Sequence, residues 1–568
     1  MKMKLSFYLL SSLILLLGMC RLSAQIPAFP EAEGFGAQAT GGRGGYVIHV
    51  TNLNISGPGS LQDALNQSGN RYIVFDVSGV INGTVEVPPG HGNFTLAGQT
   101  SPAGIIVRGF QSYNNDNPSS GNFIVRHLRS RIGTLETLPT MNWLGSDGLT
   151  LGGVSNVIVD HCSFGQANDE AVDISRSSSL TIQNCILSET LGEHSYLGGM
   201  LINYASSQSP LDNLSIIKNI WNRIGGRMPE ISCESSYCNG KSIHMELSNN
   251  LFYDPRIELW YEGVTGSGNF YLKMNAQNNY SYCQESYNNG MFHHDLLHFN
   301  PNQLYFSGNK LSKYPGLADY DLFYCCNDFD TNYPNTDFGI AQRLNQRHTF
   351  PTFNLLQTYD LPSYMTEQAG AFPRDDMDSR LMSYVRDLTF DSHPIDQEYI
   401  QDGFLIQNSI PPFPDTDQDG MPDYWEDSHS LNPNQQDHNG SQLSQQIFGI
   451  QGYTNLECYM HCLSDFVING NVNLRNYCGI QGYSYVNNEP KFTETVVHVY
   501  PNPVSQTIHI RLNTQLNYPV QAIIFDVMGR QVKAFQLSDA DTSVQVEALN
   551  GTYFIQVGSV KKRFVVIR

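Results

Sequence analysis

Short segments that alternate between apolar and polar residues recur through the first half of the chain. Eight of them open with Asn or Ser, and they follow one another at intervals of 23 to 34 residues. A repeat of this length with one strand-like segment each is typical of a solenoid. Nothing between the segments keeps a 3.6-residue apolar period, so the pattern predicts stacked strands. The segments are 93–96, 122–126, 156–160, 179–183, 213–217, 242–246, 269–273 and 302–306.

Each segment has two faces, because successive side chains of a strand point to opposite sides. The position after the opening residue and the one two further on are apolar and are expected to point inward. The next position points outward, and a parallel β-helix would stack its residues into a stripe along one sheet. Such a stripe suits an extended polymer, but the pattern favours an ordinary solvated face. The outward residues are Ala97, Arg126, Asp160, Gln183, Ile217, Glu246 and Lys273.

Two cysteines, Cys162 and Cys185, occupy the same place in consecutive repeats. Adjacent strands lie about 4.8 Å apart, which is within the Cα range of a disulfide. A disulfide and a stack of buried thiols are both compatible with this placement. Cys458 and His461 form a lone Cys-x-x-His pair. Without a second pair of similar spacing, it does not predict a zinc site.

Composition and charge narrow the class of protein. Apolar residues make up 40% of the chain, which is enough for a large core, and the formal charge is −21. Such a charge disfavours binding to nucleic acid or anionic lipid. Lys2 and Lys4 precede an apolar run at 9–17, which predicts a signal peptide over residues 1–24. No later stretch has 18 uninterrupted apolar residues, so we expect no membrane span.

Changes in composition divide the rest of the chain. We expect a parallel β-helix over 25–310, loops packed on it over 311–410, and a small acidic module over 411–465. A linker at 466–493 and a β-sandwich of short strands at 494–568 follow. The predicted fold class is therefore all-β.

The acidic module contains a run of carboxylates with calcium-loop spacing. They stand at places 1, 3, 5, 9 and 12 of the run, with Gly420 at place 6 and the backbone carbonyl of Met421 at place 7. Glycine suits the sharp turn, and a bidentate Glu closes the coordination shell. The alternative is an acidic surface turn. A calcium ion here would be structural, because the loop fills its coordination sphere. The carboxylates are Asp415, Asp417, Asp419, Asp423 and Glu426.

A second group of acids lies around the third predicted strand. Carboxylates that converge repel one another unless a cation lies between them. A cation site and a set of independent surface acids are both compatible with the spacing. The group consists of Asp147, Asp160, Asp169, Glu170 and Asp173.

Basic residues that follow the fifth predicted strand could complement these acids. Arg227 lies in a Gly-Gly-Arg-Met-Pro-Glu run. A structural arginine is the default there, but beside a bound cation Arg227 becomes a candidate partner for an anionic substrate. Arg223 could add a second positive charge, and His194 precedes a Gly-rich turn.

Several of these motifs resemble known families. Phe29-Pro-Glu-Ala-Glu-Gly-Phe-Gly-Ala, Gly41-Gly-Arg-Gly-Gly, Val159-Asp-His-Cys-Ser and Phe372-Pro-Arg-Asp resemble pectate lyases of polysaccharide lyase family 1. The calcium loop with Gly452-Tyr-Thr-Asn-Leu-Glu resembles a module attached to such enzymes in Bacteroidetes. Val499-Tyr-Pro-Asn-Pro, Met528-Gly-Arg and Gly551-Thr-Tyr resemble the sorting domain of type IX secretion.

The resemblance implies a right-handed parallel β-helix that cleaves an acidic plant polysaccharide by β-elimination with Ca²⁺. The family's calcium carboxylates correspond to Asp147, Asp169 and Asp173, and its Arg-x-Pro arginine, the catalytic residue, to Arg227. Arg223 and His194 are the predicted substrate-binding residues. We expect a monomer that the type IX machinery delivers to the cell surface or the medium.

Two alternatives come from other functional classes. The family pattern has a carboxylate where this chain has Gly145 and a second arginine where it has Ser232. These departures favour a non-catalytic, glycan-binding or adhesive β-helix. A retaining hydrolase would need two carboxyl groups about 5–5.5 Å apart, which Asp169 and Asp173 could supply.

Overall fold

A computed structural model gives the architecture of the chain. The described residues are 26–113, 120–133, 147–191, 198–256, 259–261, 264–265, 268–298, 300–324, 339–392, 399–404, 411–469, 478–480, 497–500, 504, 506–512, 519–526, 530–538, 541–546, 549–557 and 560–566. The predicted signal peptide, His194 and almost all of the predicted linker lie outside them. No helix in the described part of the chain is long and apolar enough to span a bilayer.

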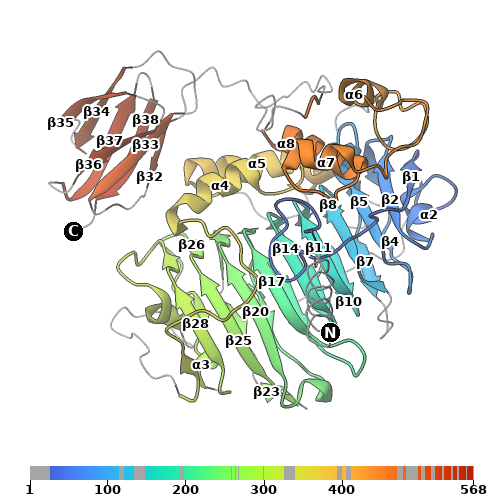
Figure 1. Ribbon diagram of the computed structural model, residues 1–568. Coiled ribbons are helices and arrows are strands. Elements are labelled where there is room, and N and C mark those ends of the chain that lie inside the picture. The colour runs from blue at the N-terminus through green and yellow to red at the C-terminus, as the bar shows by residue number, and fades with distance from the viewer. Residues whose placement is uncertain are drawn as a thin grey trace, which may run out of the picture.

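Three parallel sheets wrap around one core and form the predicted β-helix (Figure 1). The eleven-stranded sheet contains β1 (Tyr46–Val50), β2 (Arg71–Phe75), β5 (Phe94–Ala97), β8 (Phe123–Arg126), β11 (Ser155–Asp160), β14 (Ser178–Gln183), β17 (Asp212–Ile217), β20 (Ser242–Ser248), β25 (Tyr271–Gln277), β28 (Gln303–Ser307) and β31 (Gln342–Arg343). The seven-stranded sheet contains β4 (Val85–Glu86), β7 (Phe110–Tyr113), β10 (Leu149–Gly152), β13 (Glu170–Ser175), β16 (Gly198–Asn203), β19 (Glu230–Ile231) and β22 (Trp260–Tyr261). The nine-stranded sheet contains β3 (Gly79–Ile81), β6 (Ile105–Val107), β9 (Arg129–Arg131), β12 (Ser163–Gly165), β15 (Ile186–Ser188), β18 (Ile220–Asn222), β21 (Leu251–Tyr253), β26 (Tyr280–Tyr282) and β29 (Lys310–Leu311).

The other described elements are shorter or lie outside the β-helix. Two small pairs are β23 (Val264–Thr265) with β24 (Gly268–Asn269), and β27 (Phe292–His293) with β30 (Phe323–Tyr324). The helices are α2 (Leu61–Leu65), α3 (Asp295–His298), α4 (Leu361–Gln368), α5 (Asp376–Asp387), α6 (Asp423–His429), α7 (Gln442–Phe448) and α8 (Asn455–Asn469). Two antiparallel sheets enclose a separate C-terminal core and form the predicted sandwich. They contain β32 (Val497–Tyr500), β33 (Thr507–Leu512) and β36 (Asp541–Gln545), and β34 (Val520–Asp526), β35 (Gln531–Leu537), β37 (Gly551–Val557) and β38 (Val560–Val566).

The eight predicted segments are eight consecutive strands of the eleven-stranded sheet, from β5 to β28. The opening residues of the first five, which include Asn93 and Asn122, have a φ near 57°. This left-handed conformation is unfavourable for most residues but accessible to Asn. The inward apolar residues stack coil on coil, as Phe94 and Phe123 do with ring centroids 4.8 Å apart. The prediction of a parallel β-helix is confirmed.

Polar side chains also stack inside the turns of the β-helix. The side-chain amide of Asn219 donates to Asn250 at 3.2 Å, and Asn279 continues the ladder to Asn309 at 2.8 Å. Cys185 joins the same ladder, because its backbone N–H donates to Asn219. Cys162 and Cys185 are free, buried thiols. Of the two alternatives, the stack of buried thiols is therefore confirmed and the disulfide is wrong. The described disulfides are Cys233–Cys238 and Cys462–Cys478.

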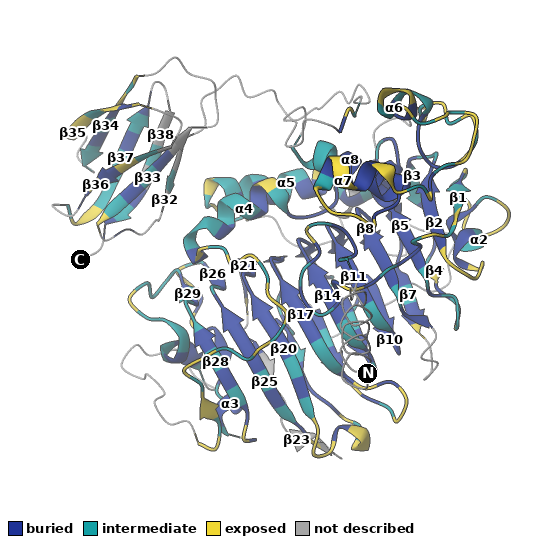
Figure 2. Cartoon of the chain, in the orientation of Figure 1, coloured by how far each residue is buried: buried dark blue, intermediate teal, exposed yellow. Residues whose placement is uncertain are grey.

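The outward stripe of the eleven-stranded sheet is not a solvated face. Asp160 and Gln183 are fully buried, because the segment after residue 26 and helix α8 cover them. Strands β11 and β14 of this sheet are mostly dark blue in Figure 2. The N–H of Gly36 donates to Thr181 Oγ1 at 2.9 Å, and Arg126 donates to Ser464 of α8. A Cβ on Gly36 would lie 2.1 Å from a strand carbonyl, so only glycine permits this approach.

The register of the stripe also differs from the prediction. Ala97, Arg126, Asp160, Gln183 and Ile217 lie opposite one another in order. Ile217 then lies opposite Ser248 rather than Glu246. A slip of two residues keeps the same face, so the apolar pattern could not reveal it.

Helices α4 and α5 cover the nine-stranded sheet, where the sequence predicted only loops. Leu361 and Leu381 pack there against Ile186 and Ile220. Asp375 receives the N–H of Asp378 at the start of α5, and Arg131 donates to Asp378 at 2.8 Å. Phe372-Pro-Arg-Asp is therefore the joint between these helices and the β-helix. In the acidic module, α8 extends past the predicted boundary at 465.

Two motifs that are far apart in the sequence meet at the start of α8. Arg43 of the Gly41-Gly-Arg motif donates to Glu457 at 2.8 Å. Glu457 also accepts the N–H of Thr454, whose hydroxyl accepts the N–H of Glu457 in return. This reciprocal cap satisfies two orphan donors of the helix terminus. The acidic module is thereby held against the N-terminal end of the β-helix.

Candidate active site

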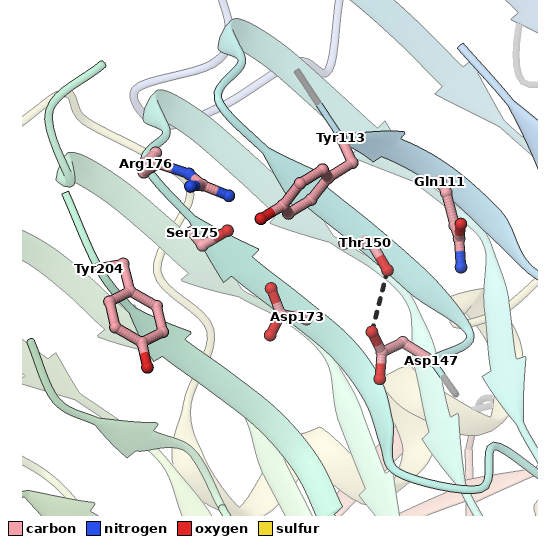
Figure 3. A pocket seen from close by; sticks show the side chains of 8 residues that line it. All are labelled: Gln111, Tyr113, Asp147, Thr150, Asp173, Ser175, Arg176 and Tyr204. Carbon is pink, nitrogen blue, oxygen red and sulfur yellow. Dashed lines mark hydrogen bonds between the residues drawn. The ribbon is translucent and has the colours of Figure 1, made fainter. Parts of the chain in front are cut away.

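The seven-stranded sheet presents a polar groove on its outer face. Gln111, Thr150 and Asp173 lie opposite one another on β7, β10 and β13, so their side chains share that face. Figure 3 shows them converging on one pocket. The pocket has a volume of about 470 Å³ and is lined by Gln111, Tyr113, Asp147, Thr150, Asp173, Ser175, Arg176 and Tyr204.

Carboxylates gather at one end of this groove. Oxygens of Asp147, Asp169 and Glu170 all lie within 4.8 Å of one another. Asp147 accepts the hydroxyl of Thr150 at 3.0 Å and the N–H of Glu170 at 3.4 Å. Burial and the charges of Asp147 and Asp169 raise the pKa of Asp173 to about 7. Repelling carboxylates of this kind fit a hard cation such as Ca²⁺.

Arg227 lies against this cluster at the turn before β19. Its guanidinium is 3.6 Å from Asp169, donates to Glu230 at 3.1 Å and contacts Glu170. The side chain is 22% exposed, and its φ is 52°. Glu170 is buried. The sequence placed it in the acidic group, but the family resemblance gave it no metal role. Its position next to Asp169 was the available signal.

The two predicted substrate-binding residues are not part of this arrangement. Arg223 is buried and pairs with Glu189 at 2.6 Å and Asp391 at 3.3 Å, in a network that Arg380 of α5 completes. Its role is to fix α5 to the β-helix, so we withdraw the substrate-binding prediction. His194 lies outside the described residues.

The acidic module holds a second group of carboxylates. Oxygens of Asp415, Asp417 and Asp419 lie within 4.8 Å of one another, and so do those of Asp419, Glu426 and Asp437. Both side-chain oxygens of Glu426 and Asp437 Oδ1 are buried without a hydrogen-bond donor among the described residues. Burial and the neighbouring acids raise the pKa of Asp419 to about 7 and that of Glu426 to about 9. These residues fit a bound Ca²⁺.

The residues that form this group differ from those that the calcium-loop spacing predicts. Asp423 turns away and accepts the N–H and hydroxyl of Thr416, both at 2.7 Å. Asp437 lies in the group instead, with a carboxylate oxygen within 4.8 Å of those of Asp419 and Glu426. Met421 is buried in the module core, and its N–H donates to Asp419. A linear spacing rule could not find Asp437, because a long connection separates it from the loop.

Several known proteins similar to this chain are named as pectate lyases. Probable pectate lyase C of Aspergillus oryzae is 30% identical over 462 residues, which cover 80% of this chain and 97% of that protein. Probable pectate lyase C of Emericella nidulans is 31% identical, with the same coverage of both chains. A solved structure of the thermostable pectate lyase PL 47 covers 60% of this chain and 97% of its own, with 16% identity and a TM-score of 0.40. A structure of pectate lyase C from Erwinia chrysanthemi with Ca²⁺ has 14% identity, covers 60% and 96%, and has a TM-score of 0.32.

The parallel β-helix and these relatives define a polysaccharide lyase. The chain belongs to the pectate lyase family, which confirms the predicted enzyme class. Residues 498–567 match the secretion system C-terminal sorting domain. The protein is therefore a lyase that type IX secretion delivers to the cell surface or beyond.

Proposed function

We propose that the chain cleaves polygalacturonate and related uronic-acid polymers by Ca²⁺-dependent β-elimination in the groove of the seven-stranded sheet. The observation that carries the proposal is that Asp147 and Asp169 lie together with Glu170 beside Arg227. Asp173 lies close enough for the charges of both aspartates to raise its pKa. The motif resemblance assigns the metal role to the three aspartates, and their mutual repulsion supports it. Asp147 is buried, so it would be the most fixed of the three ligands.

The proposed reaction breaks the C4–O bond after loss of the C5 proton and leaves an unsaturated uronate. A bound Ca²⁺ supplies Lewis acidity that makes the C5–H of a coordinated uronate more acidic. Arg227 receives that proton or stabilises the carbanion, and Glu170 and Glu230 hold its guanidinium at the turn before β19. Because guanidinium is normally protonated, its base role rests on the family resemblance.

The second carboxylate group has a different proposed role. We propose that Asp415, Asp417, Asp419, Glu426 and Asp437 hold a structural Ca²⁺ in the module. The buried oxygens of Glu426 support this proposal, since a buried carboxylate without a partner is costly.

One assay tests the proposed reaction. The purified protein is incubated with polygalacturonate and CaCl₂, and the ultraviolet absorbance of the unsaturated product is followed. We expect activity that excess chelator abolishes and that Asp169→Asn lowers by at least roughly a hundredfold. Glu86→Gln removes an exposed acid from the same sheet and should retain full activity. Activity of Asp169→Asn equal to that of Glu86→Gln would contradict the assignment.

A further inference from the structure

The end of the groove away from the acids is built from residues at the ends of successive strands. Tyr113 lies opposite Gly152, and Gly152 lies opposite Ser175. Arg176 directly follows Ser175, and its N–H donates to the carbonyl of Tyr204 on the next coil at 3.0 Å. Figure 3 shows Tyr113, Arg176 and Tyr204 around one side of the pocket that also contains Asp173.

Arg176 is held in place by an aromatic ring from two coils away. Its guanidinium carbon lies 4.7 Å from the centroid of the Tyr113 ring, which is a cation–π distance. Gly152 makes this contact possible, because a Cβ there would lie 2.7 Å from the Tyr113 ring. The guanidinium is therefore ordered before a substrate binds, which lowers the entropic cost of binding.

The charge of Arg176 acts on Asp173 without forming an ion pair, and it partly opposes the rise in the pKa of that carboxyl. Arg131, Arg223 and Arg227 each pair with carboxylates. In the described chain, no carboxylate lies within ion-pair distance of Arg176, and its buried Nε has no acceptor. A cation that lines a pocket without a partner is available to an anionic ligand.

The surroundings of Arg176 match one kind of anion, a sugar that carries a carboxylate. Tyr113 is 44% exposed and Tyr204 is 41% exposed, and both rings line the same pocket as the guanidinium. Such rings pack against the apolar faces of sugars, and the planar guanidinium binds carboxylate through two parallel hydrogen bonds. Arg176 follows Asp173 by three positions, or about 10 Å of extended strand. It is therefore beside the cleavage point and not at it.

We propose that Arg176, with Tyr113 and Tyr204, forms a subsite for the carboxylate of a uronosyl residue neighbouring the one that is cleaved. The proposal rests on the proposed function for its substrate class. It gives the acidic groove a local positive charge that selects free carboxylates over methyl-esterified ones.

Kinetics on two substrates test this subsite. Arg176→Gln should raise KM for polygalacturonate roughly tenfold, the loss expected for one charged hydrogen bond. It should leave kcat and the KM for highly methyl-esterified pectin nearly unchanged. The KM of Arg176→Lys for polygalacturonate should lie between those of the wild type and Arg176→Gln. Tyr113→Ala should raise this KM by a smaller factor than Arg176→Gln does. Arg386→Gln removes the same charge from the last turn of α5 and serves as the control.

Binding measurements separate this inference from the proposed reaction. Calorimetry with an oligogalacturonate and Ca²⁺ is carried out in an Asp169→Asn background, with and without Arg176→Gln. Weaker binding without Arg176 supports the subsite even if the wild type proves inactive on polygalacturonate. The proposal would be overturned if the two proteins bound with equal affinity, or if the Asp169→Asn protein that retains Arg176 did not bind at all. In the kinetic experiment, an equal rise in KM for both polymers would also overturn it.

Discussion

Two arginines four positions apart have opposite surroundings. Arg223 and Arg227 both have a left-handed φ, Arg223 directly after β18 and Arg227 in the turn before β19. Arg223 is 4% exposed between two carboxylates beneath α5, whereas Arg227 is 22% exposed at the groove. From the sequence alone, both residues were candidates to bind an anionic substrate through their positive charge. Only the position of α5, which follows more than 150 residues later, makes one structural and leaves the other at the site.

The role of Arg227 can be separated from its charge by Arg227→Lys. If the guanidinium acts at the proton-transfer step, kcat should fall by roughly a hundredfold or more while KM changes little. Lysine keeps the charge but loses the planar fork that reaches Asp169 and Glu230 together. Steady-state kinetics on polygalacturonate measure both parameters. Wild-type kcat would show that Arg227 is structural, and a raised KM alone would show a binding role.

At the scale of elements, the local pattern predicted the strands of the β-helix. It did not predict which segments pack over the outer faces of the sheets. Alternation located the strands because each carries its own period. The covers depend on contacts such as Arg43 with Glu457, which are 414 positions apart, and no local period encodes such a pair. The same reason explains why the sequence missed Asp437, which lies beside Asp419 and Glu426, and the helices α4 and α5. The sequence placed Asp147 and Asp169 in one acidic group, and the structure brings them together because they lie just before the neighbouring strands β10 and β13, while Asp173 lies within β13.

His127 joins three of these elements. It follows β8, its Nε2 lies 2.8 Å from Ser464 Oγ of α8, and its Nδ1 accepts the N–H of Phe372 before α5. The pKa of His127 lies well below its usual value. Burial is the main cause, and the charges of His161, Arg126 and Arg129 add to it against the opposing effect of Asp160.

The lowered pKa predicts acid sensitivity. Below pH 6.5 the unfolded chain binds a proton at this position that the folded chain does not, so stability falls as pH falls. The contribution is about 1.4 kcal/mol per pH unit. His127→Gln keeps a donor and an acceptor without titrating, so its melting temperature should fall less between pH 7 and 5. The partly exposed His91→Gln is the control, and equal slopes for His127→Gln and wild type would contradict the prediction.

In the acidic module, the effect of one substitution on stability should be opposite with and without Ca²⁺. In chelator at neutral pH, Glu426→Gln should stabilise the module. Burial and the neighbouring acids raise the pKa of Glu426 to about 9, so the wild type must take up a proton there on folding, whereas Gln need not. In Ca²⁺ the Glu426→Gln protein should be less stable than the wild type, whose ion contributes about 2.7 kcal/mol at a hundredfold excess over Kd. Limited proteolysis within 411–469 measures both states. The same order of stability with and without Ca²⁺ would show that no ion binds.

A pair of substitutions then decides the ligand set. Asp437→Asn should lose most of the protection that Ca²⁺ gives, whereas Asp423→Asn should keep it, because Asp423 bonds Thr416 instead. Melting temperature with and without Ca²⁺ reports the difference. If Asp423→Asn loses the protection and Asp437→Asn keeps it, Asp423 is the ligand, as the calcium-loop spacing predicts.

At the scale of the whole molecule, three sheets share one core but have different outer surroundings. The eleven-stranded sheet is covered by the N-terminal segment and the acidic module, and the nine-stranded sheet by α4 and α5. The seven-stranded sheet carries the groove among the described residues. Covering two sheets stabilises the solenoid and leaves a polymer one face on which to bind.

The sorting domain has its own core and a weak connection to the enzyme. Ile508, Ile524 and Phe564 are fully buried within it. Lys562 lies 3.3 Å from the exposed Asp387 of α5, and an exposed pair of this kind contributes about 0–1 kcal/mol. Deleting residues 495–568 should therefore leave the melting temperature of the β-helix and kcat on polygalacturonate unchanged, while the protein accumulates in the periplasm. Cell fractionation measures the location, and Lys562→Gln, which breaks the ion pair alone, should be secreted normally. Surface delivery of the truncated chain would show that export does not depend on this domain, and a lowered melting temperature would show that the sandwich also supports the β-helix.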